Sequence, residues 1–250
     1  MIRNKTPRAT RHLVPGTLRL DEPGGSLHCV LLAPAPDWVA IDLASGALVR
    51  SSIAATGAIG ALSGGPLTAV ALAVGPERDE WDPSRPEAIL VSGAAQGASP
   101  SKRSVRKLLS QVVKAGEDRD VLGTVGPSLA FADLEGTRPS LAVLSPEAGR
   151  VRLVGEDPLT AHFHLGSRAY AMRVAEGAAG WLETGQVPTA AGRASRGGRT
   201  SRGGRTSRRD ARGSLGPGVE VSVRVLLVVG LDRPFEGQVR KTVLGLVPAA

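Results

Sequence analysis

Short apolar runs separated by turn-forming residues constrain the fold of this chain most strongly. Gly, Pro or Asp bounds nearly every run, a pattern typical of strands joined by tight turns. The sequence therefore predicts a β-rich α+β protein. The runs expected to form strands cover residues 27–32, 38–42, 47–50, 67–74, 88–91, 140–144, 151–154, 161–165, 169–174, 219–229 and 238–247.

The composition indicates what kind of core these strands build. Apolar residues make up 42% of the 250 residues, which is ample for a buried core. Aromatic residues make up only 3%. We therefore expect a core of Ala, Val and Leu with Trp38, Trp81 and Trp181 as its few large side chains.

One segment, at about residues 100–115, has the period of an amphipathic helix. Ser99 is suited to cap it, Pro100 to its first position and Gly116 to its left-handed end. The simplest interpretation is a helix that covers a sheet with a solvated basic face, and a nucleic-acid surface is the alternative. The buried face comprises Val105, Leu108, Leu109, Val112 and Val113, and the basic face comprises Lys102, Arg103, Arg106, Lys107 and Lys114.

Four pairs of similar segments occur in the same order in the two halves of the chain. They predict a degenerate tandem duplication, with copies at about 25–116 and 128–248, each folding as a barrel-like or twisted sheet. The distance from tryptophan to Val-Arg-Lys is 24 residues in the first copy and 58 in the second, which indicates an insertion. The matched segments are 36–48 with 139–151, 69–81 with 169–181, 90–93 with 228–230, and 105–107 with 239–241.

These patterns predict an organisation in three parts. Residues 1–24 form a basic N-terminal arm, and residues 25–116 form a β-rich half-domain ending in the helix. Residues 117–250 form a second β-rich half-domain, interrupted by a disordered basic insertion at about 188–217.

The positive charge of the chain is concentrated in two segments. Residues 193–213 carry a formal charge of +7 and the first twenty residues carry +5, so the remaining body carries −4 of the total of +8. Any affinity for a polyanion should therefore reside in these segments. We call residues 193–213 the basic tract; its arginines are Arg193, Arg196, Arg199, Arg202, Arg205, Arg208, Arg209 and Arg212.

The basic tract contains the repeat R-G-G-R-T-S and too few apolar side chains to offset the entropy of ordering, which predicts disorder. It resembles arginine-glycine RNA-binding segments, which implies contacts with RNA or another acidic partner. It departs from them in lacking interleaved Phe or Tyr, which puts base stacking in doubt. A neutral expansion of a surface loop is the alternative.

His162 and His164 flank Phe163 in an expected strand, so alternation predicts that both imidazoles lie on one face. Two histidines at this spacing can hold a metal, but a complete site needs further ligands. Glu156 and Asp157 are close in sequence, while His28 and Cys29 would have to approach through the fold. A surface or partly buried pair of histidines is the alternative.

No other pattern predicts a cofactor or a catalytic group. Residues 89–102 read as strand, glycine-containing loop and basic helix start, but they lack the Gly-Lys-Ser/Thr ending of a phosphate-binding loop. No Gly-x-Ser-x-Gly elbow occurs. Cys29 and its neighbour His28 should point to opposite faces of a strand, which argues against a catalytic pair.

The single cysteine excludes an internal disulfide, and no apolar run follows the basic N-terminus, so we expect a cytoplasmic protein. Residues 51–76 carry no charge, but their glycines and Pro66 argue against a membrane span. Five lysines against twenty-six arginines indicate GC-rich codons and a bacterial source.

These observations favour a non-enzymatic binding or scaffold protein whose basic tract contacts RNA or another acidic partner. The first alternative is a small enzyme with a site between the half-domains, where Ser101 with Lys102 or His162 with His164 are the candidates. The second alternative is a structural or assembly protein, which an exposed apolar patch or an unpaired sheet edge would indicate.

Overall fold

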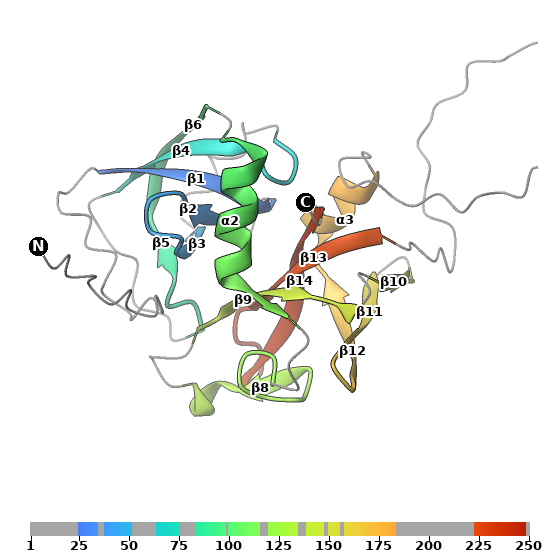
Figure 1. Ribbon diagram of the computed structural model, residues 1–250. Coiled ribbons are helices and arrows are strands. Elements are labelled where there is room, and N and C mark those ends of the chain that lie inside the picture. The colour runs from blue at the N-terminus through green and yellow to red at the C-terminus, as the bar shows by residue number, and fades with distance from the viewer. Residues whose placement is uncertain are drawn as a thin grey trace, which may run out of the picture.

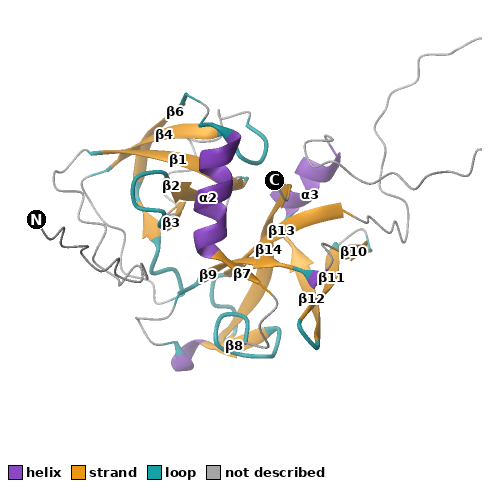
Figure 2. Ribbon diagram, viewed as in Figure 1, coloured by secondary structure: helices purple, strands orange, loops and turns teal. Residues whose placement is uncertain are grey.

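The computed structural model describes residues 25–34, 38–51, 64–75, 84–98, 100–115, 120–134, 139–147, 150–155, 158–183 and 223–248. Strands predominate in this part of the chain and helices are few (Figures 1 and 2). The strands form two mixed sheets, and the described residues do not form a closed barrel. The predicted β-rich α+β class is thus confirmed.

The first sheet has six strands and comes from residues 26–96. All neighbouring pairs are antiparallel except β3 with β5, which are parallel. The β2–β3 turn is closed by Asp42, whose carboxylate accepts a hydrogen bond of 2.7 Å from the backbone N–H of Ser45. The strand order is β5 (Ala88–Ile89), β3 (Leu48–Ser51), β2 (Val39–Asp42), β1 (Ser26–Ala33), β4 (Ala69–Val74) and β6 (Val91–Gln96).

The second sheet has eight strands and comes from residues 113–248. Its two longest strands, β13 and β14, also pair with each other, so the sheet bends back on itself. A short α-helix, α3 (Glu176–Glu183), packs against β14. The order is β7 (Val113–Ala115), β9 (Leu141–Ser145), β13 (Val223–Leu231), β10 (Arg150–Val154), β11 (Thr160–Leu165), β12 (Arg168–Val174), β14 (Gln238–Pro248) and β8 (Ser128–Ala130).

Every run predicted to be a strand overlaps an observed strand, although residues 219–222 lie outside the described part. Three short strands and α3 were not predicted. Strand β6 reads V-S-G-A-A-Q and lacks the apolar alternation of a strand, because it lies at the sheet edge and is held by pairing with β4. β7 and β8 have three residues each, too few to show a period.

The predicted amphipathic helix is α2 (Lys102–Val112), and its ends differ from the prediction. Ser101, rather than Ser99, is the N-cap, because its hydroxyl oxygen accepts a hydrogen bond of 3.2 Å from the Ser104 N–H. The helix also ends before Gly116, because Val113 is extended and starts β7, which pairs with β9. Tertiary pairing thus replaces the last predicted turn.

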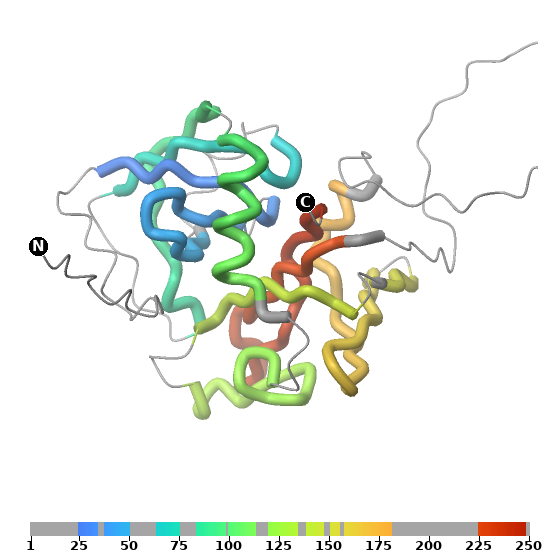
Figure 3. Tube along the Cα trace, in the orientation of Figure 1, coloured from blue at the N-terminus to red at the C-terminus, as the bar shows by residue number. Residues whose placement is uncertain are grey.

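The two sheets meet through a shared apolar cluster, to which α2 also contributes. Val105 and Leu109 of α2 are buried there beside residues of β1, β9, β13 and β14. The tube in Figure 3 shows the blue and cyan first part of the chain beside the yellow and red last part, with α2 across them in front. At the junction, β1 and β14 approach so closely that a Cβ on Gly245 would lie 2.1 Å from the Leu32 carbonyl oxygen.

The structure does not show the predicted tandem duplication. Val105-Arg106-Lys107 lie in a helix, whereas the matched residues 239–241 lie in strand β14. β2 and β3 pair with each other, whereas β13 lies between their expected counterparts β9 and β10. The matches consist mainly of Ala, Val, Leu and Gly, which pack equally well in different topologies.

Candidate nucleic-acid interface

The eight arginines of the basic tract lie in the connection between α3 and β13, outside the described residues. Both flanks of this connection are anchored in the core. Ala178 and Trp181 of α3 are buried, and β13 pairs with β9, β10 and β14. The connection that contains the tract therefore runs between two anchored elements, α3 and β13.

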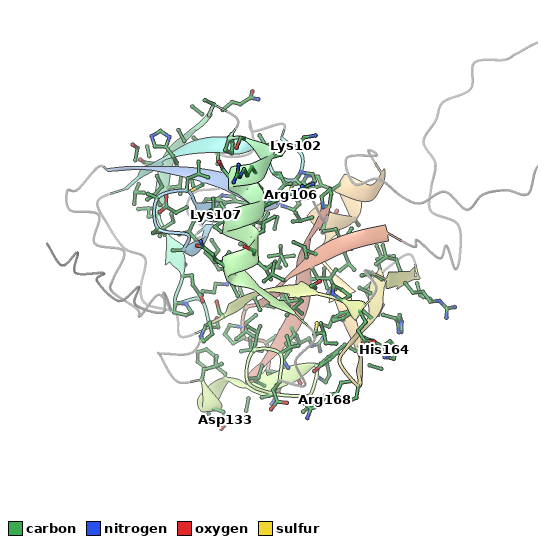
Figure 4. The ribbon with its side chains drawn as sticks, viewed as in Figure 1. Lys102, Arg106, Lys107, Asp133, His164 and Arg168 are labelled. Atoms are coloured by element: carbon green, nitrogen blue, oxygen red, sulfur yellow. The ribbon has the colours of Figure 1, made fainter. Side chains whose placement is uncertain are left out.

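Helix α2 carries the densest group of exposed cations in the described part of the chain. Lys102, Arg103, Arg106 and Lys107 are all exposed, and we call this group the α2 basic face. Figure 4 shows Lys102, Arg106 and Lys107 along α2, which crosses in front of the first sheet. The opposite face of the helix supplies the buried residues Val105 and Leu109, as predicted.

The charges of the α2 basic face destabilise the helix. The helix contains no acidic residue, and its first turn carries Lys102 and Arg103, which face the positive end of the helix dipole. Lys102 with Arg106 and Arg103 with Lys107 are like-charge pairs at i, i+4, and each such pair costs about 0.2–0.5 kcal/mol. Folding alone does not favour this charge pattern.

A second basic surface is the outer face of β10, β11 and β12. His162 and His164 are both exposed on this face, with Phe163 buried between them, so the predicted alternation is confirmed. His162 lies opposite exposed Arg152 on β10, and exposed Arg173 lies opposite Thr160. None of the three strands contains an acidic residue.

The metal site predicted at His162 and His164 gains no further ligand from the described residues. In that part of the chain, no group of three or more His, Cys, Asp or Glu side chains is placed to hold a metal ion. Glu156 and Asp157 lie outside the described residues. His28 and Cys29 belong to β1 of the other sheet. Metal binding by the histidine pair stays a prediction.

Cys29 is a core residue and lies on the opposite face of β1 from His28. Its side chain is fully buried, whereas His28 is exposed, as the alternation of a strand predicts. Burial, with a smaller contribution from the charge of Asp42, raises the pKa of the Cys29 thiol to about 12. The thiolate needed for nucleophilic chemistry is therefore disfavoured.

A buried polar cluster, which no sequence pattern revealed, links the two sheets. The Glu87 carboxylate accepts a hydrogen bond of 2.7 Å from the Ser140 N–H and another from the Ser140 hydroxyl. Arg50 of β3 donates through Nη1 to the carbonyl oxygen of Leu231 in β13 at 2.9 Å. Burial raises the pKa of Glu87, and hydrogen bonds from Ser140 and the charge of Arg50 oppose the rise.

A buried lysine lies under the loop before β8. Lys241 of β14 is 2% exposed and donates through Nζ to the carbonyl oxygen of Thr124. Burial lowers the pKa of Lys241 to about 8, and the nearby charge of Asp120 opposes this shift. Asp120 itself forms an ion pair with Arg168 at the surface. The lysine thus ties the loop to the sheet.

The residues named for the enzyme alternative are not brought together. Ser101 and Lys102 lie at the start of α2, whereas His162 and His164 lie on β11. Figure 4 places Lys102 and His164 at well-separated positions in the molecule. The two candidate groups therefore do not form one site.

Comparison with known proteins yields no relative: no family model, no curated protein and no solved structure matches this chain. Within the described residues, no helix has both the length and the apolar character needed to cross a membrane. Within the uncharged residues 51–76, residues 69–74 form strand β4.

Proposed function

We propose that this protein is a non-enzymatic binding protein of the cytoplasm whose partner is RNA, with the basic tract as the main contact. The observation that carries the proposal is the segregation of charge. The tract carries +7, while the body outside the tract and the first twenty residues carries −4. Arginines that neutralise RNA phosphates release condensed counterions, and this release drives binding.

The position of the tract supports this proposal. It occupies a connection whose two ends are fixed by α3 and β13, so its charges can be varied without altering any residue of the two sheets. The outer face of β10 to β12 also adjoins the end of this connection, because Val223 at the start of β13 pairs with Val151 of β10. The three described strands of that face contain no acidic residue that would repel RNA.

The test compares the full chain with a variant lacking residues 193–213. Affinity for a fluorescently labelled single-stranded RNA is measured by anisotropy over a series of KCl concentrations. Each phosphate contact contributes a slope of about −0.7 to log K against log salt, so loss of eight arginines should flatten the slope by up to about 6. Unchanged affinity and slope in the deletion variant, or no binding by the full chain, would refute the proposal.

A variant with every tract arginine replaced by lysine serves as the matched control. It keeps the charge but removes the planar guanidinium groups that stack on bases. Because the proposal assigns binding to neutralisation of phosphates, we expect the lysine variant to retain most of the affinity and the full salt slope.

A further inference from the structure

We infer that the α2 basic face is a second RNA-binding surface of this protein, which contacts the phosphate backbone. The inference rests on the proposed function, because it takes RNA as the partner. It adds a folded, fixed surface to the basic tract. The surface comprises Lys102, Arg103, Arg106 and Lys107.

The α2 basic face is rigidly presented. Val105 and Leu109, on the other side of the helix, are buried in the cluster between the two sheets. Ser101 caps the N-terminus, and the C-terminal end continues directly into β7. The four cations lie within six consecutive residues, about 7.5 Å along the helix axis, so they form one compact charged surface.

The charge pattern points to a polyanion. Four cations occupy six consecutive positions without an acid, although the body of the chain carries a net −4. Two of them lie at the positive end of the helix dipole, and the others repel them at i, i+4 spacing. A bound phosphate backbone would offset both unfavourable effects.

The remaining surface of α2 favours RNA over an acidic protein. Its other exposed residues are the polar Ser104, Ser110 and Gln111, and the Gln111 amide can donate a hydrogen bond to a phosphate or ribose oxygen. No large apolar side chain of the helix is fully exposed, whereas protein interfaces usually depend on aromatic or apolar anchors.

Recognition through the major groove of a DNA duplex is not supported by the surroundings of α2. The other α-helix of the described region, α3, packs against β14 and does not adjoin α2 as the first helix of a helix-turn-helix would. We therefore assign contacts with the backbone of single-stranded RNA.

The test uses two double variants that each remove two charges from the full chain. R103Q/R106Q changes the α2 basic face, and R152Q/R173Q changes the outer face of β10 to β12. RNA affinity, its salt dependence and the melting temperature are measured for both. We expect R103Q/R106Q to weaken binding and to flatten the salt slope by about 1.4. We expect R152Q/R173Q to change the slope by less than half as much.

The stability measurement separates a binding role from a structural one. R103Q/R106Q removes a cation from the first turn and breaks both like-charge pairs at i, i+4, so its melting temperature should rise while its RNA affinity falls. A variant that bound less RNA because it folded poorly would show a lower melting temperature. Opposite changes in stability and binding are therefore the expected signature.

Four outcomes would overturn the inference. Equal losses in the two double variants would mean that only net charge matters. Unchanged binding by R103Q/R106Q, with a loss on deletion of residues 193–213, would refute the α2 surface and leave the proposed function intact. Absence of binding by the full chain would refute both. Competition by polyglutamate as strong as that by unlabelled RNA would identify an acidic protein as the partner.

Discussion

The close approach of β1 and β14 makes Gly245 the position where the packing of the two sheets can be tested most directly. A Cβ at residue 245 would lie 2.1 Å from the Leu32 carbonyl oxygen and 3.0 Å from the Ala33 Cα. Both are backbone atoms of a paired strand, so neither can rotate away. Gly245→Ala therefore requires β1 and β14 to separate by about 1 Å before the contact becomes acceptable.

The cost of this separation follows from what lies around it. Overpacking in a core typically costs about 1–3 kcal/mol and occasionally more. Here the displaced strands also carry Val30, Leu244 and Val247 of the cluster that joins the sheets, so their contacts would loosen together. We expect Gly245→Ala to lower the free energy of unfolding by at least about 3 kcal/mol, which corresponds to about 6–12 °C in melting temperature.

The assay is urea unfolding followed by far-UV circular dichroism, with Gly180→Ala as the control. Gly180 lies inside α3, and a Cβ there would meet no atom within 4 Å. That substitution should raise stability by up to about 1 kcal/mol, because alanine favours the helix over glycine. If the free energy of unfolding of Gly245→Ala lay within 1 kcal/mol of that of the unchanged chain, the two strands could not approach as closely as described.

Three further predictions concern buried ionisable groups. Burial raises the pKa of Glu87 in the folded state, so its contribution to stability is largest below the unfolded pKa of about 4.5 and declines as pH rises through the folded-state pKa. Glu87→Gln should flatten this decline when the free energy of unfolding is measured in urea between pH 4 and 7. Burial lowers the pKa of Lys241 from 10.5 to about 8, so the free energy of unfolding should fall by up to about 3 kcal/mol as pH drops from 10.5 to 8. Equal pH profiles of this free energy for Lys241→Met and the unchanged chain would contradict the prediction. Cys29 should resist iodoacetamide at pH 8 in the folded chain and react in urea; rapid labelling of the folded chain would disprove its burial.

Features with a short sequence period were predicted correctly. That His162 and His164 share one face of β11 follows from the two-residue period of a strand. The buried positions of Val105 and Leu109 follow from the helical period. Both depend only on neighbours within a few residues, which the sequence displays directly.

The buried polar contacts could not be predicted, because their partners are distant in sequence. Glu87 and Ser140 are 53 residues apart, and Lys241 lies 117 residues from Thr124. Nothing in the local composition around these residues differs from that of a solvated loop or strand. Gly245 is a similar case, because its requirement for glycine comes from β1.

The predicted duplication, which the structure does not show, illustrates the opposite case. Similar short segments need not occupy similar places, because strand pairing is decided by partners elsewhere in the chain. β13 pairs with both β9 and β10 and lies between them in the strand order, so β9 and β10 do not pair with each other. The local similarity of 139–151 to 36–48 carries no information about that insertion.

The two proposed RNA contacts differ in kind, and this difference leads to a prediction about stoichiometry. The α2 basic face is fixed to the sheet junction, whereas the tract lies in the connection between α3 and β13, outside the described residues. If both contact one RNA, the second contact forms at the high effective concentration set by the first. One RNA of about 20 nucleotides should then bind to each protein molecule, whereas two RNAs of about 5 nucleotides should bind to each. The longer RNA should bind more tightly than the shorter one. Native mass spectrometry can count these complexes. Two long RNAs on each protein would show that the surfaces act independently, because a shared strand would exclude the second molecule.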